Sequence, residues 1–387
     1  MAGIIKNSQM SLRQQLSILF TIIFISCTGG IMVEDSVGSY VDHNLEPSIK
    51  SGYKNIKSLK EVWRKRYISG ISEKITISKN TAIISFLNGE VASIRIADGT
   101  QIGRRKMGKG PAIDLKLMGE NIYFALPRER KQLRSYNILK GNFNWRRRLA
   151  GGANAIALDS LYLFVSTNDG IITLNQTNGS TVWEKNEVHT IGSSLLSIGT
   201  RLIYSDLRGN VICRDIRSGD LFWKTLVSSS ILYAEPLALG EIFIGTTASG
   251  LVFAMSLIDG TITWENFFSE PIYTSPIIKD DKVIVALSSG ELKALQLKDG
   301  QEIWTFKTGQ LLSQPILITN THFILTTTQR GDIYIVDTHN GNIIWHQKIE
   351  ARIMVGPSLS DNIILISDDQ KYITAYEIIP TEETVSN

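Results

Sequence analysis

Short apolar segments recur along the chain from residue 58 to residue 379. Val211–Ile216 and Leu251–Leu257 are typical examples. Each alternates apolar with smaller or polar positions, is rich in residues that favour strands, and is bounded by turn residues. Such segments predict short β-strands, and we therefore expect an all-β chain.

The strand segments belong to a repeat that ends in tryptophan. Each copy has a strand, a turn glycine, an alternating strand, and a second turn of the Asp-Gly, Asn-Gly or Ser-Gly kind, with a Trp four residues after that glycine. The second glycines stand at 99, 141, 179, 219, 260, 300 and 341, a spacing of 38–42 residues. The seven tryptophans of the chain all belong to this series: Trp63, Trp145, Trp183, Trp223, Trp264, Trp304 and Trp345. A period near 40 residues is typical of β-propeller blades.

Each position that recurs in the copies of the repeat has a physical role. The first glycine, as in Arg208-Gly209, suits a two-residue hairpin turn whose positive φ glycine adopts without steric cost. The tryptophan follows on the outer strand, where we expect it to wedge between neighbouring blades and remove about 150–250 Å² from water. One copy departs from the pattern, because Gly103 stands where the tryptophan is expected.

The two ends of the repeat region predict the number of blades. Residues 353–379 contain three strand segments and no tryptophan, whereas the segment around Trp63 precedes any complete copy. Joining that strand to the three C-terminal ones completes a blade and leaves no long open edge. We therefore expect a single eight-bladed β-propeller of four-stranded antiparallel blades over residues 58–379, followed by a C-terminal tail at 380–387.

The N-terminal segment has the features of an export signal. Lys6 and Arg13 precede an apolar run at residues 16–25, which is too short to span a bilayer as a helix. The sequence Phe24-Ile25-Ser26-Cys27 resembles a bacterial lipobox, which predicts a signal peptide at 1–26 and acyl chains, palmitate among them, on Cys27. A plain cleaved signal and an uncleaved anchor are the alternatives. Residues 27–57 would then be a lipid-anchored tether.

Composition and charge exclude several classes of protein. A net charge of +3 does not argue for nucleic acid, and two cysteines exclude a disulfide framework. Cys213 lies in an alternating strand, which favours a small buried residue. No two histidines stand at a metal-binding spacing such as His-x-x-x-His. The sequence therefore predicts no catalytic residue, no metal site and no cofactor.

One stretch of the chain is strongly basic. Residues 101–150 contain 13 Lys or Arg and only three acidic residues. We name a basic patch within it: Arg128, Arg130, Lys131, Arg146, Arg147 and Arg148. A solvated face is one interpretation of this patch, and a surface for an acidic partner or anionic lipid headgroups is the other.

The repeat Gly-x-apolar-x-Ala-apolar-x-x-x-Asp-Gly-x-x-x-Trp, clear in 250–264 and 290–304, resembles that of quinoprotein propellers, or PQQ-like repeats. Together with Cys27 and one propeller of this length, it resembles the BamB family of outer-membrane protein assembly lipoproteins. The resemblance implies a non-enzymatic scaffold that docks by loops on one face to the periplasmic domains of the barrel subunit, BamA, and presents unfolded outer-membrane proteins to it. The residue after Cys27 is Thr28 and not Asp. In lipoproteins that this segment resembles, such a residue is typical of an outer-membrane destination, which implies the periplasmic side of the outer membrane of a Gram-negative bacterium.

The resemblance points to two loops as a protein interface, although it matches no single residue. Residues 184–194 contain neither Leu nor Arg, the side chains that the family uses there, and residues 224–235 are rich in serine. The candidate contacts in the two loops are Glu187, His189, Ile231, Leu232, Tyr233 and Glu235.

Two other functions are compatible with a propeller. A lipoprotein of another envelope complex would share the anchor and the repeat. A dehydrogenase dependent on pyrroloquinoline quinone (PQQ) and Ca²⁺ would share the repeat. The enzymes of that family that the repeat resembles are considerably longer and typically carry a vicinal Cys-Cys pair, and this sequence has no adjacent cysteines.

Overall fold

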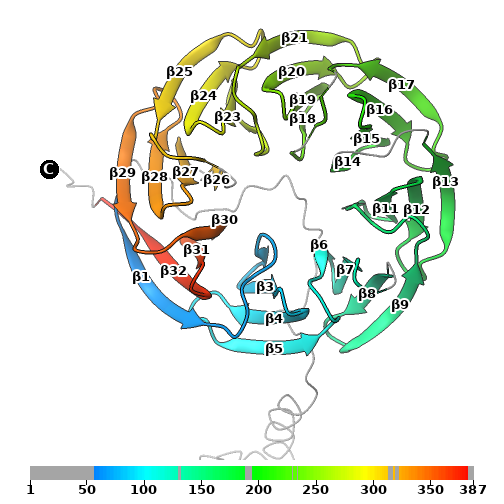
Figure 1. Ribbon diagram of the computed structural model, residues 1–387, viewed down its shortest axis with the longest axis horizontal. Helices are drawn as coiled ribbons and strands as arrows, with labels where there is room; N and C mark the ends of the chain where they lie inside the picture. Colours follow the sequence, from blue (N-terminus) through cyan, green and yellow to red (C-terminus); the bar gives the residue numbers. More distant parts are fainter. Residues whose placement is uncertain are drawn as a thin grey trace, which may run out of the picture.

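Each copy of the repeat folds as one antiparallel four-stranded sheet, and eight such blades surround a central axis (Figure 1). The computed structural model describes residues 56–129, 132–187, 194–228, 230–232, 234–312, 317–318 and 322–381. The prediction of an all-β, eight-bladed propeller is confirmed. No helix in these ranges is long and apolar enough to cross a membrane.

The strands of a blade follow one another from the axis to the rim. Blades 1 to 4 contain β2 (Thr76–Ser78), β3 (Thr81–Ser85), β4 (Glu90–Arg95), β5 (Gln101–Lys106); β6 (Ile113–Met118), β7 (Asn121–Leu126), β8 (Gln132–Asn137), β9 (Asn142–Arg148); β10 (Ala155–Leu158), β11 (Tyr162–Thr167), β12 (Gly170–Asn175), β13 (Thr181–Asn186); and β14 (Leu196–Ile198), β15 (Arg201–Ser205), β16 (Asn210–Asp215), β17 (Leu221–Leu226). Blades 5 to 7 contain β18 (Leu237–Leu239), β19 (Ile242–Thr246), β20 (Leu251–Ser256), β21 (Ile262–Phe267); β22 (Ile277–Lys279), β23 (Lys282–Ala286), β24 (Glu291–Gln296), β25 (Glu302–Lys307); and β26 (Leu317–Ile318), β27 (Phe323–Thr327), β28 (Asp332–Asp337), β29 (Ile343–Lys348).

Blade 8 joins the two ends of the propeller, as the sequence predicts. Its strands are β30 (Ile353–Ser360), β31 (Ile363–Asp368), β32 (Tyr372–Pro380) and, at the rim, β1 (Ile56–Arg66). β1 and β32 pair along their length, with Trp63 opposite Ala375. This pairing closes the ring without a free strand edge between its ends.

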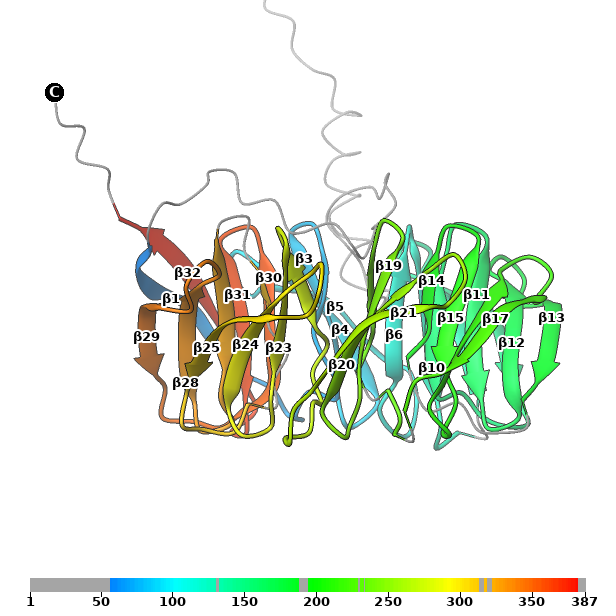
Figure 2. The same ribbon diagram turned by 90° about the horizontal axis from the view of Figure 1, so that it is seen from above.

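The ring has two faces, which differ in the connections that they carry. The connector face holds the connections between blades and the turns between second and third strands. The hairpin face holds the remaining turns of each blade. In Figure 2 the outer strands β13 and β29 point toward the connector face at the lower edge, whereas β32 ends at the hairpin face at the upper edge. β1 begins at that same face, because it is antiparallel to β32 and its first residue pairs with Pro380.

Tryptophans link neighbouring blades through one contact that the repeat reproduces. The indole Nε1 of Trp183 in blade 3 donates to the carbonyl oxygen of Ile216 in blade 4, at 2.9 Å, and its ring covers Gly219. A Cβ at Gly219 would lie 2.7 Å from that ring, so glycine is required there by space as well as by its φ of 72°. Equivalent Nε1–carbonyl bonds of 2.7–3.1 Å join Trp63 to Ile96, Trp145 to Gln176, Trp223 to Leu257, Trp264 to Leu297 and Trp304 to Thr338.

Blade 1 fills the tryptophan position in another way. Gly103 pairs with Ser93 just as Trp145 pairs with Ser135 in blade 2, so Gly103 occupies the tryptophan position. Two residues later, the Arg105 guanidinium lies 5.1 Å from the Tyr136 ring centre and donates to the Gly141 carbonyl oxygen of blade 2. A cation–π contact and a charge-assisted hydrogen bond therefore replace the indole at this junction.

Candidate functional site

The connector face carries more of the large exposed apolar side chains than the hairpin face, when positions inside the rim strands are set aside. Among the described residues, eight of them lie in its loops or at its strand ends: Ile68, Leu87, Leu207, Leu226, Phe267, Tyr273, Leu311 and Met354. The hairpin face has six: Leu139, Leu161, Leu221, Leu239, Ile258 and Ile343. An exposed apolar patch indicates a protein interface, so the grouping of these side chains on neighbouring blades matters more than their number.

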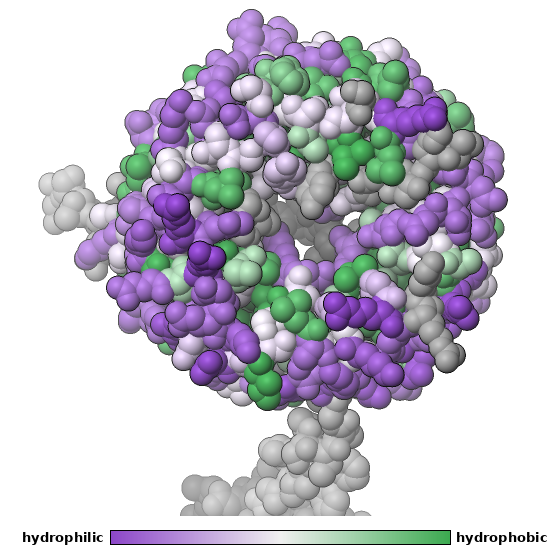
Figure 3. Space-filling model, viewed as in Figure 1, coloured by the Kyte–Doolittle hydropathy of each residue, from purple (hydrophilic) through white to green (hydrophobic). Residues whose placement is uncertain are grey.

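Blades 4 to 6 contribute the densest part of this surface. Leu226 ends β17 and Phe267 ends β21, so they occupy equivalent positions in neighbouring blades, and each is 66% exposed. Leu207 lies in a turn of blade 4, and Tyr273 and Leu311 lie in the following connections between blades. Figure 3, which views the connector face, shows hydrophobic side chains in groups around the central opening. Phe267, Tyr273 and Leu311 escaped the sequence prediction, because it assigned the interface only to the loops at 184–194 and 224–235.

Glu187, a candidate contact of the first loop, points into the protein. Its carboxylate accepts hydrogen bonds from the Tyr204 hydroxyl and from Arg214, whose Nη2 lies 2.9 Å away, and the side chain is 12% exposed. Arg214 also donates to the Gly219 carbonyl oxygen. Glu187 therefore joins blade 3 to blade 4 and is not available to a partner. His189 lies outside the described residues.

The candidate contacts of the second loop divide between the interior and the surface. Leu232 is buried against Gly245 and Phe253, and Ile231 is half-buried. Glu235 is exposed, and Tyr233 lies outside the described residues. The part of this loop that presents apolar surface is its first residues, around Leu226.

A group of charged side chains links blades 1 and 2 beside the innermost strands. The Glu73 carboxylate accepts hydrogen bonds from the backbone N–H groups of Asp114, at 2.7 Å, and Leu115, at 3.0 Å. Burial raises the pKa of Glu73 to about 7, and these two bonds offset only part of the effect. Burial lowers the pKa of Lys116, but the carboxylates of Glu235, Asp114 and Glu73 outweigh it and raise that pKa. Glu235 of the second candidate loop thus interacts with the inner wall of the ring.

The raised pKa of Glu73 predicts a pH dependence of stability. Between pH 4.5 and about 7 the folded protein retains a proton that the unfolded chain releases, so stability falls as pH rises through this range. Glu73→Gln should remove this pH dependence. Between pH 5 and pH 8 the wild type should lose about 1–3 kcal/mol of unfolding free energy relative to the variant, measured by urea denaturation. The exposed Glu350→Gln is the control, and equal pH profiles for wild type and Glu73→Gln would contradict the expectation.

The structure divides the basic residues into two groups. Several form internal contacts: Arg104 with Glu90, Arg134 with Glu129, Lys116 with Asp114, and Arg147 with the Gly179 carbonyl oxygen of blade 3. Of the basic patch, Arg128, Arg146 and Arg148 are exposed, and Arg146 packs over the Phe143 ring. Arg130 and Lys131 lie outside the described residues. The exposed basic surface is therefore the rim at β9 together with Arg128.

Cys213 has no reactive surroundings. Cys213 is a free, buried thiol, and burial raises its pKa to about 12, which agrees with the prediction of a small buried residue. Cys27 lies outside the described residues. The fold does bring Asp280, His322 and His339 together, a group that sequence spacing did not predict.

A protein-family model described as outer membrane protein assembly factor BamB matches residues 87–231 and 208–363. Curated proteins of the same name are similar to parts of the chain. That of Yersinia pestis is 23% identical over 53% of this chain and 58% of its own length, and that of Moranella endobia is 24% identical over 61% and 64%. The matched stretches thus span about three fifths of these two relatives.

Solved structures show the same fold. The crystal structure of BamB from Moraxella catarrhalis superposes with a TM-score of 0.69 at 15% identity, covering 83% of this chain and all of that one. A computationally designed protein, Ika8, reaches a TM-score of 0.72 at 14% identity, covering 81% of this chain and 98% of that one. Because a designed protein fits equally well, the shape alone does not specify a function.

Proposed function

This chain belongs to the protein family described as outer membrane protein assembly factor BamB, and from that premise we propose that it is a non-enzymatic scaffold of the machinery that assembles outer-membrane β-barrel proteins. Its partner would be the barrel subunit, a BamA-like protein, and its cargo unfolded outer-membrane proteins. The relatives' name describes an assembly factor, which supports a binding role.

The connector face supports the docking part of this proposal. Among the described residues, eight exposed apolar side chains lie on that face against six on the opposite one, and five of the eight lie on blades 4 to 6 or in the connections that follow them. Leu226 and Phe267 are the central candidates, because both are strand ends held in position by sheet pairing with Asn210 and Leu251. Because sheet pairing already fixes the backbone at these positions, binding has to order only the side chains, which favours affinity.

The position of the first strand supports a lipid anchor that leaves this face accessible. β1 begins at the hairpin face, with Ile56 opposite Pro380. A tether from a lipidated Cys27 would therefore join the ring on the side away from Leu226 and Phe267. Such an anchor would place the protein on the periplasmic side of the outer membrane with its connector face open to a partner.

Co-purification tests the proposed function. The full chain, tagged at its C-terminus and extracted from native envelopes with mild detergent, should recover the barrel subunit of the assembly machinery in near-stoichiometric amount. Recovery of a different envelope complex would replace the proposal by the alternative of a propeller lipoprotein with another partner. A PQQ-dependent turnover in the same preparation would overturn the non-enzymatic role.

The exposed basic rim predicts a salt-dependent contribution to this contact, on the proposal that it meets an acidic partner surface. Arg146→Glu combined with Arg148→Glu should weaken capture about 3–10-fold at low salt and flatten its salt dependence, measured by pulldown. Arg217→Glu combined with Lys298→Glu makes the same charge change at exposed hairpin-face positions. The interpretation of a merely solvated rim is correct if both double variants behave alike.

A further inference from the structure

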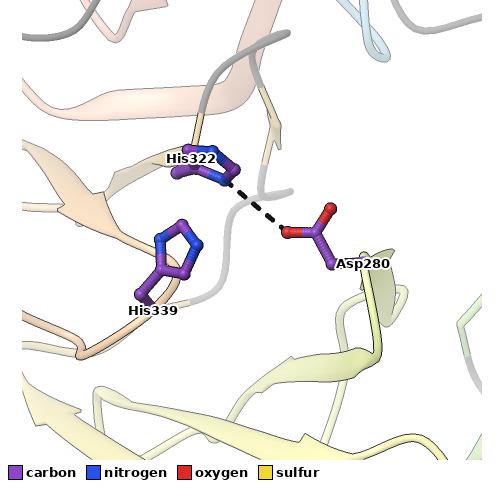
Figure 4. A group of neighbouring side chains, drawn as sticks. All are labelled: Asp280, His322 and His339. Carbon is purple, nitrogen blue, oxygen red and sulfur yellow. Dashed lines mark ion pairs between the residues drawn. The ribbon is translucent and has the colours of Figure 1, made fainter.

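Three turns of blades 6 and 7 bring two imidazoles and a carboxylate together on the hairpin face. Asp280 lies in the turn between β22 and β23, His322 immediately before β27, and His339 in the turn between β28 and β29. One potential metal-ligand atom from each residue lies within 4.8 Å of the other two. In Figure 4 the two imidazole rings and the carboxylate converge on one space.

A fourth residue orients His339. Asp337 Oδ1 lies 3.2 Å from Nδ1 of the His339 ring and also accepts the backbone N–H of His339, at 2.7 Å. With Nδ1 held in this way, Nε2 is the nitrogen left to face Asp280 and His322 (Figure 4). Carboxylates that fix the second ring nitrogen of a histidine are a regular feature of metal sites.

His322 and Asp280 already lie close to each other. Nδ1 of His322 is 3.6 Å from Oδ2 of Asp280, and the rings of His322 and His339 have centroids 4.1 Å apart at an angle of 61°. The three side chains are about half exposed, at 58% for His322, 46% for Asp280 and 50% for His339. They therefore have room to close the remaining distance by small rotations about their side-chain bonds.

The repeat does not require histidines at these positions. The His322 carbonyl oxygen accepts the Thr338 N–H, a backbone bond that other blades make with different residues at the same place, as Thr200 does for Ile216 and Glu241 for Leu257. The residue after Thr338 is His339, whereas the corresponding residues are Arg217 in blade 4 and Ile258 in blade 5. The two imidazoles therefore have no role in forming the blade.

The repeat does not require aspartate at position 280 either. Its φ of 53° lies in the left-handed region, and the equivalent turn has Gly119, Gly199 and Gly240 in blades 2, 4 and 5 but Lys79 and Asp361 in blades 1 and 8. Glycine adopts this conformation without cost, and aspartate tolerates it better than most residues. The turn therefore accepts several residue types, and in blade 6 the residue at this position is a carboxylate beside two imidazoles.

We propose that Asp280, His322 and His339 bind one Zn²⁺ ion that links blade 6 to blade 7. Two imidazole nitrogens and one carboxylate oxygen, at about 2.0–2.2 Å from the metal, are ligands that suit zinc better than Mg²⁺ or Ca²⁺. Water fills the fourth position of the tetrahedron. Asp337 is a positioning residue that holds His339 in the binding tautomer.

Zinc at this position would strengthen the junction between blades 6 and 7. Blades 6 and 7 already contact each other through Trp304, whose Nε1 donates to the Thr338 carbonyl oxygen at 2.9 Å, one residue from His339. Zinc bound to Asp280 on one blade and to His322 and His339 on the other would add a second link at the hairpin face. A metal that binds only the folded state stabilises it, and above the dissociation constant this stabilisation grows with the logarithm of the free metal concentration.

Isothermal titration of the full chain, stripped of metal and held in detergent, with Zn²⁺ tests the proposal. We expect one ion per chain with a dissociation constant in the micromolar range, weakened about tenfold or more by His322→Gln or His339→Gln and less severely by Asp337→Asn. His346→Gln is the matched control, because His346 lies on β29 beside Asp332 and outside the group. Circular dichroism without metal verifies that each variant is folded.

A second readout separates this site from zinc bound elsewhere on the chain. Zn²⁺ should raise the melting temperature of the wild type and of His346→Gln by several degrees, but not that of the His322→Gln, His339→Gln double variant. Binding weaker than millimolar, or equal affinity in wild type and the double variant, would overturn the proposal. The test is independent of whether the connector face binds the barrel-assembly machinery.

Discussion

Replacing Trp223 by alanine is expected to lower the free energy of unfolding by about 3–5 kcal/mol. Trp223 is 8% exposed, its ring covers Gly260 of blade 5, and it belongs to a hydrophobic cluster with Cys213 of its own blade and Phe243 and Phe253 of blade 5. Its Nε1 donates to the Leu257 carbonyl oxygen of blade 5, at 3.1 Å. The substitution therefore leaves a cavity between blades and removes the hydrogen bond to that buried carbonyl oxygen.

Urea denaturation followed by tryptophan fluorescence and circular dichroism measures this loss. Since domains are stable by only about 5–15 kcal/mol, the midpoint should fall strongly. Leu221→Ala, two residues away on β17 and exposed, should change stability by no more than about 0.5 kcal/mol. Equal effects of the two substitutions would show that the tryptophans do not hold the blades together.

The second large effect concerns the connector face. Leu226→Asp combined with Phe267→Asp should weaken capture of the barrel-assembly machinery by about 100-fold, because each aspartate places a charge in an interface that must exclude water. Both side chains are 66% exposed, so the variant should fold with wild-type stability. Quantitative pulldown from solubilised envelopes is the measurement.

The opposite face supplies a matched control for this variant. Leu239→Asp combined with Ile258→Asp makes the same chemical change at side chains that are 50% and 55% exposed on the hairpin face of blade 5. We expect that pair to bind like wild type. If the hairpin-face variant loses binding and the connector-face variant does not, the interface lies on the hairpin face and the proposal is wrong.

Local sequence signals were sufficient to predict the fold. The tryptophans and turn glycines repeat because six of the junctions between blades use the same indole over the same glycine, as Trp264 over Gly300. Closure by β1 followed from the absence of a tryptophan in the last segment. The irregular copy at Gly103 also has a local explanation, because Arg105 and Tyr136 meet at that junction.

Side-chain direction in the loops could not be predicted in the same way. Glu187 looked like a loop residue open to a partner, but Arg214, 27 positions further along, and Tyr204 draw it inward. Leu232 is buried for a similar reason, because glycine at 245 leaves space above Phe253. Contacts between blades decide these cases, and the repeat pattern does not contain them.

The group of Asp280, His322 and His339 was missed for a geometric reason. Motif reasoning searches for ligands a few residues apart, whereas these three lie 17–59 positions apart along the chain. The propeller brings successive turns of neighbouring blades to one face at a period near 40 residues. Searching for metal ligands at that period would have found Asp280 and His322.

Site-specific photo-crosslinking in intact cells tests the central claim most directly. A photoreactive amino acid replaces Phe267 on the connector face or, as the control, Ile258 on the hairpin face, and the adducts are identified by mass spectrometry. Our account predicts a covalent adduct with the barrel subunit of the assembly machinery from position 267 and none from position 258. The absence of that subunit from the adducts at 267, or its capture from 258 instead, would contradict it.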